Sequence, residues 1–299
     1  MARPVLRWIG YVAGALVVLL ILFAATVYAV SSARLSRTYE IVPEQVAIPG
    51  DSATIARGEH LARSRLGCAD CHGPDLSGGA VVESDMFGHF IAPNLTRGEG
   101  GLGARFTDAD WIRSIRHGVK RDGHPVVFMP SDEFSRLSED DLAAVIAFVR
   151  QVPPVDGAQP ASRLGPIARA LVTFNPRVLP AAAIDHASPI PAAPMAEVSA
   201  RYGEYLANTS GCRGCHGPDL AGAKPMEPGG VPPANLTPGG PLATWSESDF
   251  VRALREGIRP DGSALSPSMP WKAMGRMNDL ELHALYAYLK SIPPKSGKA

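Results

Sequence analysis

The segment Cys68-Ala69-Asp70-Cys71-His72-Gly73-Pro74-Asp75-Leu76 occurs a second time in the chain, as Cys212-Arg213-Gly214-Cys215-His216-Gly217-Pro218-Asp219-Leu220. Both copies contain Cys-x-x-Cys-His, and together they use all four cysteines of the 299 residues. Within each copy the two cysteines lie three positions apart, which is about one turn of a helix. Each copy therefore presents two thiols from a single turn, followed directly by an imidazole.

This arrangement is the attachment signature of haem c. The thiols can form thioethers with the two vinyl groups of one haem, and the histidine can bind the iron as its proximal ligand. A thioredoxin-like redox pair, a zinc site and a structural disulfide are the alternatives. They are disfavoured because no βαβ pattern surrounds the motif, the pairs lie 144 residues apart, and a disulfide needs no histidine in both copies.

We therefore predict two covalently bound haem c groups, each containing iron. The predicted attachment residues are Cys68, Cys71, Cys212 and Cys215, and the predicted proximal iron ligands are His72 and His216.

The repeat extends well beyond the cysteines. Further landmarks occur twice in the same order: Gly-Glu-x-Leu-Ala at 58–62 and 203–207, Asn-Leu-Thr at 94–96 and 235–237, Asp-Gly at 122–123 and 261–262, Met-Pro at 129–130 and 269–270, and Pro-Pro at 153–154 and 293–294. Such an order indicates two copies of one domain. The predicted regions are a membrane anchor and juxtamembrane segment at 1–45, domain 1 at 46–155, a Pro-rich linker at 156–195 and domain 2 at 196–299.

The sixth iron ligand is expected downstream of each motif. Met129 and Met269 occupy equivalent positions, 57 and 53 residues after their histidines, and each precedes a proline. Proline favours an extended backbone for the preceding residue, which suits a ligand presented from a loop. We predict both as distal iron ligands, although core packing is the ordinary role of a methionine. Competing candidates are Met86, His89, His117 and His124 in the first copy, and Met226, Met274, Met277 and His283 in the second.

Each copy has the pattern of a helical domain. Four helix starts are predicted where a capping residue stands three positions before an acidic one, at Thr107, Ser138, Ser246 and Asn278. The first and third of these helices are expected to end at Gly118 and Gly257. No alternation of apolar and polar residues is long enough to predict a strand. The predicted fold class is therefore all-α with long loops.

An uncharged run of 23 residues, Trp8 to Val30, contains 20 hydrophobic ones. One helix of this length can cross a bilayer. A cleaved signal peptide with its site at Val27-Tyr28-Ala29 is the alternative, but the run is longer than the usual apolar core of such a peptide. We predict an uncleaved transmembrane helix. Basic residues flank both ends of the run, so charge alone does not set its orientation.

Nine prolines fall within residues 153–194, and a helix cannot run through that density of proline. We interpret this region as a linker between the two domains. Two arrangements remain open. Apolar residues such as Leu164, Ile167 and Phe174 pack against a haem domain, or the segment forms an extended spacer.

The overall composition excludes several classes of protein. Lys+Arg and Asp+Glu both number 29, so the formal net charge is zero and the basic surplus of a nucleic-acid binder is missing. A hydrophobic content of 45% excludes a chain that is disordered throughout. No paired carboxylates, nucleophile elbow or phosphate loop stands out, and no catalytic residue is predicted.

Together, these repeated landmarks and the final amphipathic helix before Pro-Pro resemble class I cytochrome c. The tandem arrangement is similar to bacterial membrane-anchored dihaem cytochromes c, over about residues 52–294. The resemblance implies that the first and last helices of each domain cross, and that the haem replaces much of the apolar core. It also implies haem attachment outside the cytoplasm, so that the chain after about Ser31 faces the periplasm or the cell exterior.

The resemblance further implies an electron-transfer protein and not an enzyme. It would relay single electrons at the cytoplasmic (inner) membrane, with a dehydrogenase, an oxidase or a soluble cytochrome as redox partner. A dihaem peroxidase-type enzyme, which needs an accessible iron, is one alternative. An assembly subunit of a larger respiratory complex is another. Gluconate-type dehydrogenase cytochrome subunits usually carry three haems, whereas this chain has two motifs.

Overall fold

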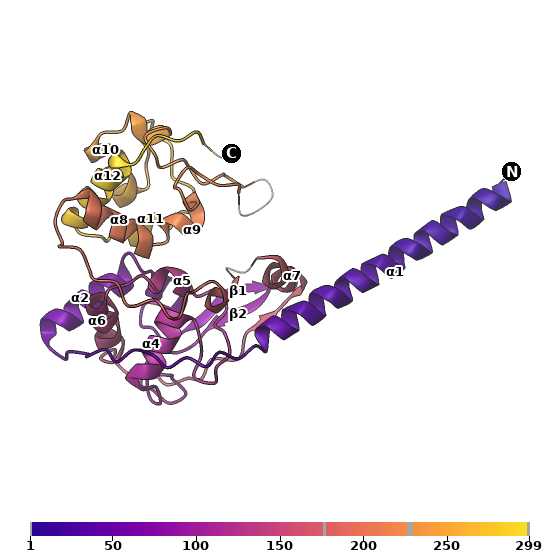
Figure 1. Cartoon of the computed structure of the whole chain (residues 1–299), viewed down its shortest axis with the longest axis horizontal. Helices are drawn as coiled ribbons and strands as arrows, with labels where there is room; N and C mark the ends of the chain where they lie inside the picture. The colour runs from indigo at the N-terminus through magenta and orange to yellow at the C-terminus, as the bar shows by residue number, and fades with distance from the viewer. Residues whose placement is uncertain (1, 176–177, 226–229, 298–299) are drawn as a thin grey trace.

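The computed structural model describes residues 2–175, 178–225 and 230–297. Two mainly helical domains lie against each other, and a long N-terminal helix, α1 (Ala2–Leu35), projects away from the first domain (Figure 1). Within it, Pro4–Leu35 is long and apolar enough to cross a membrane. Large apolar side chains are exposed along most of this helix, a surface that water does not favour.

The two domains repeat one order of helices. Domain 1 contains α2 (Ser52–Arg63), α3 (Cys68–His72), α4 (Asp108–His117), α5 (Ser131–Phe134) and α6 (Glu139–Val149). Domain 2 contains α8 (Ala200–Thr209), α9 (Cys212–His216), the 3₁₀ turn η3 (Pro241–Ala243), α10 (Glu247–Glu256), α11 (Trp271–Met274) and α12 (Asp279–Ser291). The predicted helical fold class is confirmed.

Local signals set the helix boundaries as predicted. Side chains cap the starts of α4, α6, α10 and α12 at Thr107, Ser138, Ser246 and Asn278. Helices α4 and α10 end at Gly118 and Gly257, whose φ angles of 64° and 72° lie in the left-handed region. The predicted boundaries are therefore confirmed in both copies.

The first and last helices of each domain cross in close contact, α2 against α6 and α8 against α12. The glycine of Gly-Glu-x-Leu-Ala makes this contact possible. A Cβ atom on Gly58 would lie 1.8 Å from the carbonyl oxygen of Ala144, and one on Gly203 would lie 2.0 Å from that of Ala284. Any larger residue would force the helices apart, so these glycines set the distance between them.

Each domain has its own apolar core next to this crossing. Trp111 on α4 and Phe250 on α10 occupy equivalent positions, and both are buried in the core of their domain. The middle helix of each copy therefore contributes an aromatic ring to the space between the crossed helices and the attachment turn.

A small antiparallel sheet is the main feature that the sequence does not predict. β1 (Gly79–Ser84) and β2 (Gly88–Ala92) form a hairpin, and β3 (Arg163–Leu164) from the linker pairs with β2. The β1–β2 register shifts between Ala80 and Val82. Runs this short and irregular do not separate a strand from a loop by their periodicity.

The described part of the linker packs against domain 1 and contains a helix. α7 (Pro166–Phe174) starts with a proline in its first turn, where the missing N–H has no partner to lose. The 3₁₀ turn η2 (Pro180–Ala182) follows it. Val172, Val178 and Leu179 are buried together, with Val127 of domain 1 packed against them. The linker therefore packs in part, through Leu164, Leu171 and Val172. Ile167 and Phe174, which are also expected to pack in that arrangement, are exposed.

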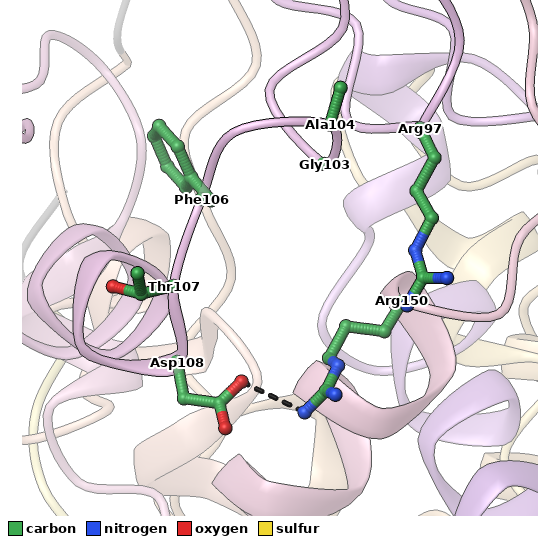
Figure 2. Close-up of a pocket in the computed structure, with 7 residues that line it drawn as sticks. All are labelled: Arg97, Gly103, Ala104, Phe106, Thr107, Asp108 and Arg150. Atoms are coloured by element: carbon green, nitrogen blue, oxygen red, sulfur yellow. Dashed lines mark hydrogen bonds and ion pairs between the residues drawn. The ribbon is translucent and has the colours of Figure 1, made fainter.

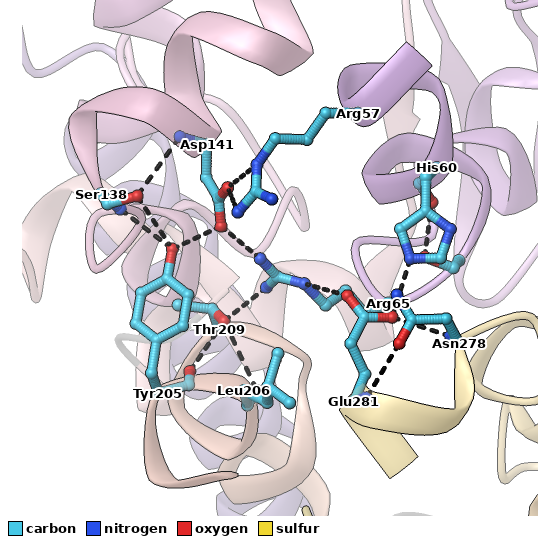
Figure 3. A network of polar contacts seen from close by, with 11 residues as sticks. Arg57, His60, Arg65, Ser138, Asp141, Tyr205, Leu206, Thr209, Asn278 and Glu281 are labelled. Atoms are coloured by element: carbon cyan, nitrogen blue, oxygen red, sulfur yellow. Dashed lines mark hydrogen bonds and ion pairs between the residues drawn. The ribbon is translucent and has the colours of Figure 1, made fainter. Parts of the chain in front are cut away.

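The two domains meet through a buried polar network built from equivalent positions of the repeat (Figure 3). His60 in α2 and Tyr205 in α8 occupy the variable position of Gly-Glu-x-Leu-Ala. His60 Nε2 lies 2.7 Å from Glu281 Oε2, and Tyr205 Oη donates to Asp141 Oδ2 at 2.6 Å. Asp141 and Glu281 are in turn the acidic residues of the α6 and α12 caps. The interface is therefore approximately twofold symmetric.

Arg65 occupies the middle of this network, and its side chain is buried. Its guanidinium donates to Asp141 Oδ2 at 2.5 Å and to Thr209 Oγ1 at 2.6 Å. Its Nε lies 4.0 Å from Glu281 Oε1. Buried charges are tolerated only when each is paired, because removing them from water is costly. Arg65 thus compensates two buried carboxylates that belong to different domains.

We expect Arg65→Met to destabilise the holoprotein by about 3 kcal/mol, because it keeps the side-chain volume but removes the fully buried cation from the two carboxylates. Among the residues that the structure describes, Asp141 then retains only Arg57, and Glu281 only His60, as a basic partner. Denaturant titration measures this change. The control is Arg252→Ala, which breaks an exposed ion pair with Asp249 and should leave stability unchanged within error. Equal stability of the two variants would contradict the role given to Arg65.

The acid sensitivity of the interface is expected to follow Glu281. Burial alone would raise the pKa of Glu281, but the hydrogen bond and charge of His60, the Asn278 backbone and Arg65 outweigh it, and the pKa lies below its ordinary value of 4.5. A carboxylate with a lowered folded pKa contributes stability above its unfolded pKa and loses it as the pH falls through the folded pKa. The free energy of unfolding should therefore fall more steeply below about pH 4.5 in the native protein than in Glu281→Gln. Parallel pH profiles would refute this.

Candidate haem-binding sites

Each Cys-x-x-Cys-His motif forms a helix of one turn between two left-handed glycines. α3 follows Gly67 with φ of 60° and ends at Gly73 with φ of 79°. α9 follows Gly211 with φ of 80° and ends at Gly217 with φ of 82°. Only glycine adopts such angles without strain, so the chain turns sharply on either side of the thiols.

None of the four cysteines forms a disulfide, so each can provide a thioether bond to haem. The first cysteine of each motif packs against the apolar core of its domain. Burial raises the pKa of Cys68 and of Cys212 to about 12, because a thiolate there would lose its water. The surroundings of these two sulfur atoms are therefore apolar, which fits the edge of a porphyrin.

The two motif histidines have identical supports. His72 Nδ1 lies 3.0 Å from the carbonyl oxygen of Pro93, and His216 Nδ1 lies 2.7 Å from that of Ala234. A carbonyl can only accept, so Nδ1 carries the proton and Nε2 keeps its lone pair. Burial lowers the pKa of both histidines despite these hydrogen bonds. A neutral imidazole with a free Nε2 and a fixed Nδ1–H is the form that binds iron.

The repeated Asn-Leu-Thr loop ties this support to the far end of the domain. Asn94 Nδ2 donates to the carbonyl oxygen of Val155 at 2.7 Å, and Asn235 Nδ2 donates to that of Lys295 at 2.8 Å. Each asparagine Oδ1 accepts the backbone N–H of the threonine two positions on, Thr96 or Thr237. The loop that holds the histidine is therefore fixed to the segment that follows the last helix.

A leucine with a strained backbone follows each motif, and apart from its recurrence in the repeat no sequence pattern predicts the strain. Leu76 and Leu220 are both fully buried and both have φ of 59°. A non-glycine residue in this region costs about 1–2 kcal/mol. Their carbonyl oxygens accept the N–H of Leu95 at 2.9 Å and of Leu236 at 2.8 Å. The strain thus persists at the same place in both domains, next to the attachment turn.

The predicted distal methionines also share one local structure. Met129 and Met269 each precede a proline that starts a short helix, α5 or α11. Both side chains are partly buried, Met129 against the core of domain 1 and Met269 against that of domain 2. Each therefore reaches the same core as the first cysteine of its own motif.

Most of the competing candidates have other contacts. Met274 and Met277 are core residues of domain 2. His117 lies 3.0 Å from Glu44 and 3.1 Å from His186, and His283 lies 2.7 Å from Glu247. His124 pairs with Asp122, while Met86 and His89 belong to the β1–β2 hairpin region. Met226 lies outside the described residues.

A separate pocket of about 680 Å³ opens at the start of α4 (Figure 2). Its lining residues are Arg97, Gly103, Ala104, Phe106, Thr107, Asp108 and Arg150. Asp108 accepts from Arg150 at 2.9 Å across it. None of the predicted attachment or ligand residues lines this pocket.

Comparison with known families agrees with this geometry. Residues 53–149 match the family described as cytochrome C oxidase, cbb3-type, subunit III, and residues 200–293 match the family described as cytochrome c. Both halves of the chain are thus cytochrome c domains. The chain is a dihaem cytochrome c. It binds two haem c groups covalently and functions in electron transport.

Similar proteins are named as cytochrome subunits. The chain is 31% identical over 285 residues to an alcohol dehydrogenase (quinone) cytochrome c subunit of Gluconacetobacter polyoxogenes, covering 82% of this chain and 57% of that protein. It is 27% identical over 268 residues to a fructose dehydrogenase cytochrome subunit of Gluconobacter japonicus (81% and 53%). It is 29% identical over 285 residues to a diheme cytochrome c-type protein of Cereibacter sphaeroides (87% and 92%). The chain therefore spans little more than half of the two dehydrogenase subunits.

Exchanging the distal ligand tests each methionine. A thioether gives a haem a higher reduction potential than a second imidazole does. We expect Met129→His to lower the potential of the domain 1 haem alone, and Met269→His that of the domain 2 haem alone, in a spectroelectrochemical titration. Met277→Leu, a volume-conserving change in the core, is the control and should move neither potential. If Met129→His or Met269→His changes neither reduction potential, the methionine replaced in that variant is not an iron ligand.

Proposed function

We propose that the chain is a membrane-anchored periplasmic dihaem cytochrome c, which relays single electrons from a dehydrogenase to a further acceptor. The observation that carries this proposal is the repetition of one site in two domains, with the same histidine support and the same Met-Pro turn. Two irons that each hold a histidine and a methionine have no open position for a substrate.

The proposed roles of the residues follow from their positions. Cys68, Cys71, Cys212 and Cys215 attach the haems, His72 and His216 bind the irons on the proximal side, and Met129 and Met269 bind them on the distal side. The haems supply reversible one-electron chemistry. The protein orients each imidazole through Nδ1–H, places a thioether opposite to it, and keeps water from the iron through its apolar core.

Contacts at the domain interface favour electron exchange between the two sites. Glu133, four residues after Met129, reaches the second attachment helix: a Cβ atom on Gly214 would lie 2.7 Å from Glu133 Oε1. In the other direction, Arg276, seven residues after Met269, donates to the carbonyl oxygen of Arg63 at 3.1 Å, close to the first motif. The distal segment of each domain thus meets the attachment side of the other.

Anchoring rests on α1. We propose that it spans the cytoplasmic membrane once, with the amino end inside and the haem domains in the periplasm or at the cell exterior. Covalent haem c attachment outside the cytoplasm, as the family resemblance implies, supports this orientation. The relatives named as dehydrogenase cytochrome subunits support a dehydrogenase as the electron donor.

The test is purification of the tagged full-length protein from membranes. We expect a dehydrogenase subunit to co-purify, and both haems to be reduced when the substrate of that dehydrogenase is added. Cys68→Ala/Cys71→Ala and Cys212→Ala/Cys215→Ala should each retain one haem by pyridine haemochrome assay, and each should interrupt transfer to the acceptor.

Two outcomes would contradict the proposal. Steady consumption of hydrogen peroxide by the purified protein would favour the peroxidase-type enzyme. A complex in which the haems stay oxidised during dehydrogenase turnover would favour an assembly subunit.

A further inference from the structure

The linker helix α7 contacts the C-terminal part of α1, next to domain 1 (Figure 1). Arg34 Nη1 donates to the carbonyl oxygen of Val172 at 2.9 Å, and Thr173 Oγ1 donates to that of Val27 at 3.2 Å. Arg169 Nη1 donates to Ser31 Oγ at 3.0 Å. Polar contacts therefore attach α7 to α1 at several points, over the last turns of α1.

α7 is apolar on two faces, although only one of them is covered by protein. Ala168 and Val172 are fully buried toward α1 and domain 1. On another face, Ile167 is 42% exposed and Phe174 is 67% exposed. Met86 of the hairpin lies next to Ile167, whose N–H donates to the Met86 carbonyl at 3.0 Å, and Met86 is 56% exposed. The uncovered face is thus an apolar stripe with exposed side chains at both ends of α7.

The depth of this stripe can be measured along α1. The ring of Phe174 stacks on that of Phe23, with centroids 6.3 Å apart and planes 11° apart. Phe23 precedes Tyr28 by five residues, or about 7.5 Å of helix axis. Tyr28, with the guanidinium of Arg169 4.1 Å above its ring, has the composition of a membrane-interface anchor. Phe174 therefore lies on the membrane side of that level.

We propose that α7 is a second membrane-inserted element, with Phe174 immersed in the acyl chains of the outer leaflet and with Ile167 and Met86 at the boundary between acyl chains and headgroups. The proposal rests on the proposed spanning of the bilayer by α1. An immersion of about 5–10 Å is typical of helices that lie in the interface. Lipid is the occupant because the stripe continues the exposed apolar surface of α1 itself, as the Phe23–Phe174 stack shows. Arg34 and Arg169 then lie at the level of the headgroups.

Spin labelling of the full-length holoprotein in phospholipid vesicles tests this directly. Since haem attachment consumes the four native thiols, an introduced cysteine is the single free one. We expect a label at Phe174→Cys to collide readily with oxygen and poorly with a water-soluble nickel chelate, as a label at Leu19→Cys in the middle of α1 does. Ile167→Cys and Met86→Cys give independent readings if one variant fails to fold. Ala109→Cys, on the exposed side of α4, is the aqueous control.

Each possible result has a distinct meaning. Lipid-like accessibility at 174, together with lower nickel accessibility at 167 or 86 than at 109, supports the proposal. Nickel accessibility at 174 equal to that at 109, with a lipid-like label at 19, overturns it and leaves the membrane anchor intact. Low accessibility to both reagents at 174 also overturns it, because a protein surface then covers the stripe. A water-accessible label at 19 overturns the anchor and the further inference together.

Discussion

The crossing of the first and last helices is the constraint on which each haem site depends. Gly58 and Gly203 bring two backbones into contact, and this holds the attachment turn, which follows the first helix, beside the last one. The chain leaving the last helix is then bound by the Asn-Leu-Thr loop. The residue before that loop accepts the Nδ1–H of the proximal histidine. The helix contact therefore affects the orientation of the proximal imidazole through two hydrogen bonds. One joins the asparagine to the chain after the last helix, and the other joins the histidine to the residue before that asparagine.

The domain interface uses the repeat a second time. In a twofold interface between two like domains, each contact occurs twice. If position i of the first domain contacts position j of the second, then position j of the first contacts position i of the second. His60 with Glu281 and Tyr205 with Asp141 follow this rule, and they recruit cap residues that each domain already needs for its own last helix. Arg65 breaks the symmetry, because one domain supplies the cation that compensates carboxylates from both. The buried Glu281 of domain 2 therefore lies near a cation, Arg65, that domain 1 provides.

The sequence predicted what short-range signals determine: the attachment turns, the helix caps and the helical class of the domains. It did not identify the partner of Asn94, because Val155 lies 61 residues further on. The interdomain network was missed for the same reason, since His60 and Glu281 are 221 residues apart. The high proline content of the linker argued against a helix, yet α7 forms there. Its proline, Pro166, stands in the first turn, where a helix accepts proline. The assignments of the iron ligands remain predictions.

The buried interface also limits how the proposed relay can work. The side chains of Arg65, Asp141 and Glu281 are buried, and separating the domains would break the hydrogen bonds that join His60 to Glu281, Tyr205 to Asp141 and Arg65 to Thr209. The two sites therefore keep one spacing during turnover, and electron exchange within the chain requires no domain motion. What remains variable is the encounter with donor and acceptor, which depends on surface charge and hence on ionic strength. In the proposed function, salt therefore affects the rate at which the protein associates with its electron donor and acceptor. It does not affect the rate of electron transfer between the two haems.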